Sequence, residues 1–148
     1  VEMLDDILPE GVIVSVKDNK GTAEEYTSDA ATRLNIPLTV LINENSASAS
    51  EIFAGAIKDY GVGTLVGETT YGKGIVHTIF SLKDGTGMKL TIEDYYLPSG
   101  KSIHKVGVAP DVEIDLPEEL KMYVNIPEDQ DVQLQKAMEI LKEQLQKN

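Results

Sequence analysis

The chain contains no cysteine in its 148 residues. Disulfides, thiolate metal sites and cysteine nucleophiles are therefore excluded, and the composition is compatible with an oxidising compartment. The chain also lacks an apolar run near the roughly 18 residues that a membrane-spanning helix needs. No basic segment followed by an apolar one opens the sequence, so we expect no signal peptide within these residues.

Basic residues are scarce. The chain has 13 Lys and Arg against 25 Asp and Glu, for a net charge of −12. This balance argues against nucleic acid or anionic lipid as a partner. A length of 148 residues with 41% hydrophobic and 26% charged residues is typical of one soluble globular domain.

The central part of the chain predicts a βαβ unit. Residues 38–42 form a short apolar run that is typical of a buried strand, and residues 64–66 form a second one. Between them, residues 46–60 have helical periodicity. Gly61 is expected to end this helix, and Glu51 and Lys58 fall opposite its apolar face. That face consists of Ile52, Phe53, Ala56, Ile57 and Tyr60.

The flanking segments predict added hairpins and a C-terminal helix. Strand-like pairs 11–17 with 22–27, and 75–82 with 88–96, are each joined by Asp- and Gly-containing turns. Residues 101–117 are expected to be extended. Residues 131–147 are expected to form a helix capped by Asp129 or Asp131, with an apolar stripe of Leu134, Ala137, Met138, Leu141 and Leu145. The fold class is therefore α/β.

The start of the chain resembles the end of a longer helix. Leu4, Ile7 and Leu8 have helical spacing, and Pro9 and Gly11 then stop the pattern. Because the first residue is not Met, we expect the chain to be a fragment of a longer one.

A serine-rich turn, Asn45 to Glu51, leads from the first buried strand into the helix. A serine here can act as a nucleophile beside the unpaired N–H groups of a helix start. Serine is equally a favoured helix cap, so a purely structural role is the alternative. The helical wheel does not choose between Ser48 and Ser50.

A glycine-rich loop, Gly67 to Gly74, follows the second buried strand and nearly matches a phosphate-binding loop. The hydroxyl position of that motif is occupied by Gly74, and a strand rather than a helix follows, so nucleotide binding is not expected. Lys73 is either a solvated charge or is carried inward by its flanking glycines.

The two histidines, His77 and His104, do not have the spacing of metal ligands, so no metal site and no cofactor are expected. His77 lies in a predicted strand and His104 in an extended loop. The carboxylate pairs Glu24–Glu25 and Glu118–Glu119 are interpreted as surface charge.

Three segments resemble the carboxyl-terminal processing, or tail-specific, serine peptidases. They are LTVLINENSASASEIFAGAIKDYGVGTLVGETTYGKG, KLTIEDYYLPSGKSIHKVGVAPDVEI and PEDQDVQLQKAMEILK. The resemblance covers nearly the whole chain. Its two catalytic motifs stand in the expected order, 73 − 48 = 25 residues apart.

The resemblance implies a serine–lysine dyad and a fold with ββα units related to the crotonase and Clp-type peptidases. By motif match, Ser48 is the nucleophile, Lys73 the base and the Ala49 N–H an oxyanion donor. A lysine is a base only when uncharged, and burial favours that form, so Lys73 is expected to be desolvated in the working enzyme and hydrogen-bonded to Ser48 Oγ. The implied reaction is endoproteolysis near substrate C-termini through an acyl-enzyme.

The chain departs from the family at one position. The family usually has glutamine four residues after the lysine, where this chain has His77. An imidazole can accept a hydrogen bond from the lysine, so we interpret His77 as a substitute for that glutamine.

The family also carries a PDZ module and a glycine-rich segment upstream of the part seen here. Residues 1–148 are thus expected to be the C-terminal part of the catalytic domain, with weak activity alone and sheet edges that favour homo-oligomers. The alternative is a catalytically inactive binding or scaffold fragment. The family further implies protein substrates with disordered C-termini and an extracytoplasmic location: the periplasm, the cell envelope or the outside of the cell.

Overall fold

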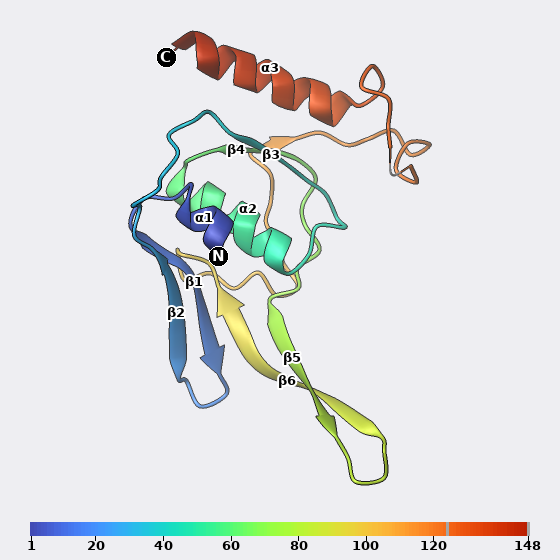
Figure 1. The fold of residues 1–148 in the computed structure, drawn as a ribbon. Helices are drawn as coiled ribbons and strands as arrows, with labels where there is room; N and C mark the ends of the chain where they lie inside the picture. Colours follow the sequence, from blue (N-terminus) through green and yellow to red (C-terminus); the bar gives the residue numbers. More distant parts are fainter. Residues whose placement is uncertain (124, 148) are drawn as a thin grey trace.

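A computed structural model describes residues 1–123 and 125–147 of the chain. Three helices and seven strands follow one another along these residues (Figure 1). Their order is α1 (Glu2–Asp5), β1 (Gly11–Asp18), β2 (Ala23–Ser28), β3 (Thr39–Ile42), α2 (Ala49–Tyr60), β4 (Thr64–Gly67), β5 (Ile75–Ser81), β6 (Gly87–Tyr96), β7 (Val112–Glu113) and α3 (Val132–Lys147).

The predicted βαβ unit is present. Strands β3 and β4 pair in parallel, with Val40 opposite Leu65, and β7 adds to the other edge of β4. The crossover helix α2 starts later than predicted, at Ala49 rather than residue 46, because residues 43–48 form a turn. The α/β expectation is thereby confirmed.

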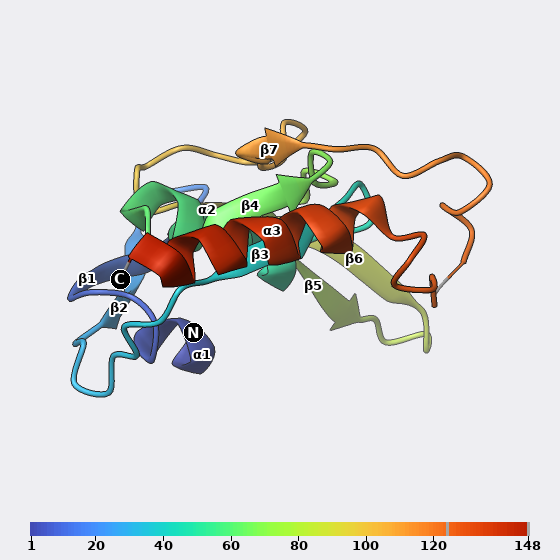
Figure 2. The ribbon, with the colours of Figure 1, turned by 90° about the horizontal axis from the view of Figure 1, so that it is seen from above.

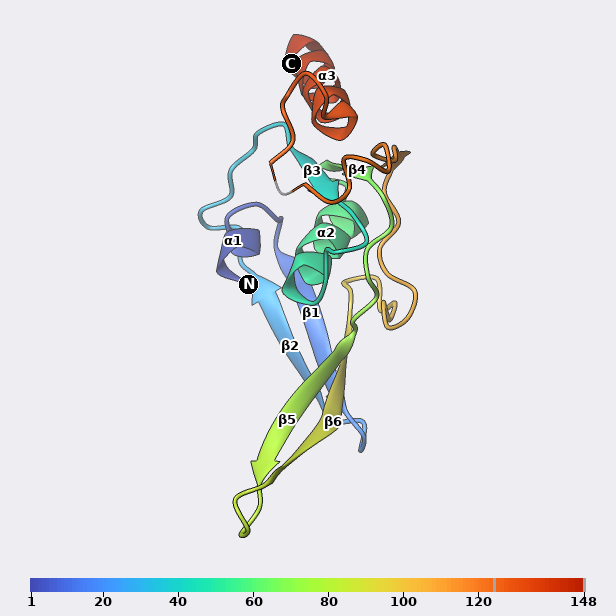
Figure 3. The same cartoon turned by 90° about the vertical axis from the view of Figure 1, so that its right-hand side faces the viewer.

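Both predicted hairpins form and join into one antiparallel sheet in the order β2-β1-β6-β5. Strands β5 and β6 extend as a long arm away from the rest of the molecule (Figure 3). The arm exposes Ile79 (71% accessible) and Phe80 (44%) near its tip. Strands β2 and β5 are the two edges of this sheet.

The core lies where α2 meets the two sheets. Ala54, Ala56 and Ile57 of α2 are fully buried with Ile13 of β1 and Leu65 of β4, and Leu8 after α1 closes one end. Burying each large aliphatic side chain contributes roughly 1.5–3 kcal/mol. The core therefore fixes the start of α2 relative to both sheets.

The C-terminal helix begins as predicted and packs along β3 and β4 (Figure 2). The Asp131 carboxylate accepts the Leu134 N–H at 2.9 Å and caps it. The predicted apolar stripe is partly wrong, since Met138 and Leu145 are 46% and 63% exposed. Gln133 is buried instead, because its Nε2 donates to the Ile114 carbonyl at 2.7 Å.

Residues 101–117 are less extended than predicted. A turn around Lys105, which has φ of 62°, interrupts them, and only the two residues of β7 are in a strand. None of the helices among the described residues is long and apolar enough to cross a bilayer.

Candidate active site

Ser48 occupies the turn between β3 and α2, immediately before the helix. Its backbone has φ of 58° and ψ of −116°, a conformation that non-glycine residues rarely adopt. Such a conformation costs of the order of 1–3 kcal/mol and persists only where the surrounding structure imposes it. Here the turn directs the Ser48 hydroxyl into a cavity of about 510 Å³.

We call this cavity the Ser48 groove. One wall is the start of α2, with Ser48, Ala49 and Ile52. The opposite wall is one face of the four-stranded sheet, to which every strand contributes: Tyr26 of β2, Val14 and Val16 of β1, Tyr95 and Lys89 of β6, and Ile75, His77 and Ile79 of β5. Lys73 lines the groove just before β5 begins.

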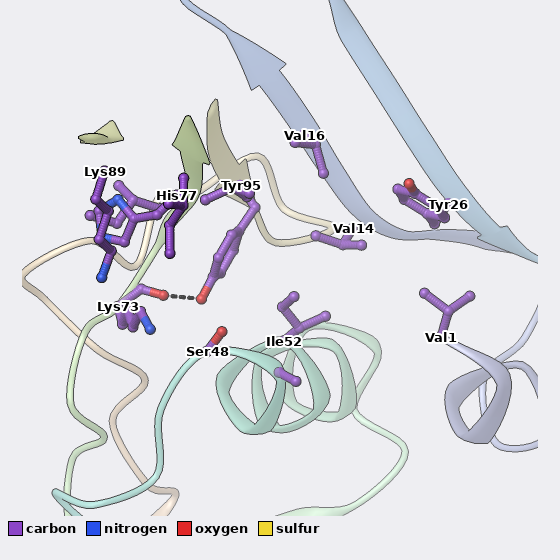
Figure 4. A pocket seen from close by; sticks show the side chains of 14 residues that line it. Val1, Val14, Val16, Tyr26, Ser48, Ile52, Lys73, His77, Lys89 and Tyr95 are labelled. Carbon is purple, nitrogen blue, oxygen red and sulfur yellow. Dashed lines mark hydrogen bonds between the residues drawn. The ribbon is translucent and has the colours of Figure 1, made fainter. Parts of the chain in front are cut away.

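The structure distinguishes between the serines of the loop. Ser46 and Ser50 line a different cavity, of about 850 Å³, between α1, β3 and α2. Ser48 lies in the groove that also holds Lys73 and His77 (Figure 4). The helical periodicity alone left this choice open.

Close backbone packing places Lys73. Gly72 has φ of 87°, and an added Cβ would lie 3.0 Å from the backbone nitrogens of Val106 and Gly107. At Gly74 an added Cβ would lie 2.7 Å from the His104 nitrogen. Glycines thus let this loop lie against residues 103–107, as the sequence indicated, and Lys73 faces the groove between them.

Glu51 was predicted to face away from the apolar side of the helix and is instead completely buried. Its carboxylate accepts hydrogen bonds from Thr70 Oγ1 at 2.6 Å and from the backbone N–H groups of Gly72, Lys73 and Ser48 at 2.7, 2.8 and 2.9 Å. These donors compensate for the loss of water around the charge. The prediction was wrong because a polar loop covers this side of the helix.

A local signal for Glu51 exists in the sequence. Serine followed three residues later by glutamate is the pattern in which a helix-capping residue and the third helical residue bond to one another. The Ser48 N–H donating to Glu51 is one half of that arrangement. Glu51 thereby binds the backbones of both predicted catalytic residues, Ser48 and Lys73.

Tyr95 also lies beside the two predicted residues, although no local sequence pattern indicated it. Its hydroxyl donates to the Lys73 carbonyl and lies beside the Ser48 hydroxyl (Figure 4). Burial raises the pKa of Tyr95, the neighbouring Ser48 hydroxyl lowers it in part, and the charge of Glu51 raises it. The phenol is therefore a neutral donor in this site at ordinary pH.

The other predicted groups have distinct surroundings. His77 Nδ1 lies 3.1 Å from Thr91 Oγ1 on the adjacent strand, which leaves Nε2 as the nitrogen available to the groove. No hydrogen bond joins Ser48 Oγ to Lys73 Nζ within residues 1–123 and 125–147. Ala49 is the first residue of α2, where N–H groups lack a partner within the helix. The described residues contain no cluster of metal-binding side chains.

Comparison with known proteins matches residues 1–114 to the model of peptidase family S41. A carboxyl-terminal-processing protease from Synechocystis is 42% identical over 134 residues, which are 90% of this chain and 31% of that protein. A probable CtpA-like serine protease from Staphylococcus aureus is 41% identical over 107 residues, 71% of this chain and 22% of the relative.

Two solved structures of proteases are also similar to this chain. The photosystem II D1 C-terminal processing protease is 39% identical with a TM-score of 0.70, and the match covers 78% of this chain and 31% of that one. The tricorn protease, at 21% identity, shares the fold with a TM-score of 0.61 over 98% of this chain and 14% of that one. The chain thus spans about a third of the length of the carboxyl-terminal-processing proteases. On the family match and these identities, the chain belongs to peptidase family S41, with the carboxyl-terminal processing serine peptidases.

Proposed function

We propose that this chain is the core of a serine endopeptidase that cleaves protein substrates near their C-termini, with Ser48 as nucleophile and Lys73 as general base. The observation that supports the proposal is the convergence of three parts on one groove: the Ser48 hydroxyl, the Lys73 side chain and the helix start at Ala49. Glu51 ties the backbones of Ser48 and Lys73 together and so limits their relative movement.

In the proposed reaction, Ser48 Oγ attacks the carbonyl carbon of the scissile peptide while its proton passes to the neutral amine of Lys73. The Ala49 N–H donates to the oxygen that becomes negative. The tetrahedral intermediate then breaks its C–N bond. Lys73 gives the proton to the leaving amine, and an ester remains on Ser48. A water molecule then attacks the ester carbonyl, with Lys73 taking its proton. The bond between the carbonyl carbon and Ser48 Oγ breaks, Lys73 returns the proton to Oγ, and the carboxylic acid product leaves.

His77 is proposed to orient the lysine in place of the family's glutamine. When Nδ1 donates to Thr91 Oγ1, Nε2 carries a lone pair that can accept a hydrogen bond from Lys73. His77→Gln is expected to retain or raise activity, because the amide oxygen also accepts. Full activity in His77→Ala would show that the position is dispensable.

The competing proposal is a binding or scaffold unit of the same family with no turnover. A fluorophosphonate probe that reacts with activated serines separates the two. We expect the probe to label the wild-type protein at Ser48, and to label neither Ser48→Ala nor Lys73→Ala. The absence of labelling and of peptide cleavage in the full-length wild-type protein would favour the scaffold function.

The remaining expectations concern the wider protein. We propose that residues 1–148 form the C-terminal part of the catalytic domain, since the relatives are about three times longer. Substrates are proposed to be proteins with disordered C-termini, acted on outside the cytoplasm. A relative from Tetradesmus obliquus, 41% identical over 110 residues, 74% of this chain and 24% of that protein, is described as chloroplastic.

A further inference from the structure

The Ser48 groove has two chemically different ends. Because the strand order is β2-β1-β6-β5, residues of β2 and β5 lie at opposite edges of the sheet that forms its wall. In Figure 4, Val14, Val16 and Tyr26 lie on one side of Ser48, and Lys73, His77 and Lys89 lie on the other. The first end is apolar and the second is basic.

The basic end stands out in so acidic a chain. The protein carries a net charge of −12, yet none of the described residues that line the groove is an aspartate or glutamate. Lys89 lies on β6 directly opposite Ile79 of β5, and both side chains line the groove. The proposed reaction uses Lys73 and His77 but leaves Lys89 without a role.

Negative charge lies at the other end. Glu24 of β2 lies opposite Val16 of β1, and its hydrogen bond and charge raise the pKa of the Tyr26 phenol. Burial and the charge of Glu93, which lies on β6 opposite Val76, raise it by smaller amounts. The two lysines that line the groove, Lys73 and Lys89, both lie at the end away from Tyr26, so the field of the lining residues is positive there. A peptide with a free C-terminus has its negative group at one end, so this field favours one direction of binding.

We propose that Lys89 is a substrate-positioning residue whose ammonium group binds a carboxylate of the substrate on the C-terminal side of the scissile bond, in particular the terminal carboxylate of a short tail. The inference rests on the proposed function, because the position of the scissile bond is taken from Ser48. It adds a specificity element to that site and predicts which substrates are cleaved best.

The geometry sets the length of the preferred tail. Tyr95, whose hydroxyl contacts Ser48, and Lys89 are six residues apart on β6, which corresponds to about 20 Å along a strand at roughly 3.3 Å per residue. The flexible lysine side chain shortens the span. An extended peptide therefore needs about five residues between the scissile bond and the carboxylate.

The test is peptide cleavage by the full-length protein. Matched peptides carry two, five or ten residues after the scissile bond, each ending in a free acid or an amide. Because Lys89 is exposed, we expect KM to be about two- to fivefold lower for the acid, in the range measured for exposed ion pairs. The preference should be largest for the five-residue tail, should weaken with salt and should leave kcat nearly unchanged.

Lys89→Gln is expected to remove the preference for the acid, and Lys89→Glu to reverse it. Lys83→Gln is the matched control, because Lys83 lies in the turn of the same hairpin and does not line the groove. A further peptide, amidated but with glutamate as its fifth tail residue, shows whether a side-chain carboxylate replaces the terminal one. Rescue of KM by this peptide would support carboxylate binding by Lys89 from either source.

The inference is overturned if Lys89→Gln and Lys83→Gln change the acid preference equally, or if the preference is the same for all three tail lengths. Failure of the proposed function is recognised separately, because either the wild type would then cleave no peptide or Ser48→Ala would retain activity. Binding of the same peptides to Ser48→Ala, measured by fluorescence anisotropy, tests Lys89 without turnover. Equal affinity for acid and amide there would also contradict the inference.

Discussion

The Glu51 carboxylate accepts the backbone N–H of Lys73 at 2.8 Å across a contact between the first turn of α2 and the glycine-rich loop. The same oxygen accepts the N–H of Ser48 at 2.9 Å. A single buried charge therefore holds in register two segments that the chain separates by 25 residues (73 − 48). It lies beneath the site, bonded to backbones rather than to the proposed dyad's side chains.

Glu51→Gln is expected to lower both stability and activity. The amide keeps one acceptor oxygen but turns a donor toward N–H groups that already donate, so at least one buried donor loses its partner. We expect a loss of about 2 kcal/mol in the free energy of unfolding, measured by urea denaturation, together with a fall in kcat/KM. Glu143→Gln, on the exposed side of α3, is the control and should change neither. Equal behaviour of the two variants would contradict a structural role for the buried carboxylate.

Tyr95→Phe removes one hydroxyl and keeps the ring in the core. The Lys73 carbonyl loses its partner and the Ser48 hydroxyl loses a polar neighbour, so the free energy of unfolding should fall by about 1 kcal/mol. A similar loss of free energy in the transition state, caused by poorer orientation of Ser48, would reduce kcat about tenfold. Tyr96→Phe is the matched control, because the Tyr96 ring lies 4.7 Å from Lys17 Nζ and does not line the groove. Unchanged kcat in Tyr95→Phe would show that the phenol does not orient Ser48.

Alkaline pH should destabilise the protein partly through Tyr95. Burial holds the pKa of this phenol above its usual value, so the unfolded chain loses that proton first as the pH rises. Its contribution to stability is complete below the unfolded pKa of about 10 and is lost progressively above it. The melting temperature, measured between about pH 8 and pH 11, should fall more steeply in the wild type than in Tyr95→Phe.

Gly72→Ala and Gly85→Ala form a pair that isolates crowding beside Lys73. The two glycines have nearly equal φ, 87° and 85°, but only Gly72 has backbone atoms near the added Cβ; Gly85 has nothing within 4 Å. Gly85→Ala should cost about 1–2 kcal/mol for the left-handed conformation alone. Gly72→Ala should cost more than that and should also reduce activity, because the loop must shift. Equal losses in the free energy of unfolding, measured by urea denaturation, would mean that the loop around Gly72 shifts without cost.

The regular elements could be predicted from the sequence because their patterns are local. The apolar runs at β3 and β4, the helix between them and the two hairpins are each specified by neighbouring residues and by Gly and Asp turns. The motifs that place Ser48 and Lys73 in one groove are also short and ordered. Prediction therefore succeeded in finding the elements whose signal is contained in one segment, although the start of α2 and part of the apolar stripe of α3 were wrong.

Prediction failed where distant segments decide the outcome. Glu51 has a polar side chain on a helix, and only the packing of the loop around Gly72 makes its position buried. Gln133 is buried by a bond to the Ile114 carbonyl, while Met138 remains exposed. Tyr95 approaches Ser48 only through the register of β6 against β5 and β1. Such contacts depend on the tertiary arrangement, which periodicity does not encode.

The backbone of Ser48, with its φ of 58°, has a practical consequence for engineering. Glycine adopts this conformation without steric strain, so Ser48→Gly should melt at a higher temperature than the wild type. A library screened only for expression or heat resistance would then enrich glycine at this position. The most stable clone would then lack the hydroxyl group that the proposed reaction requires.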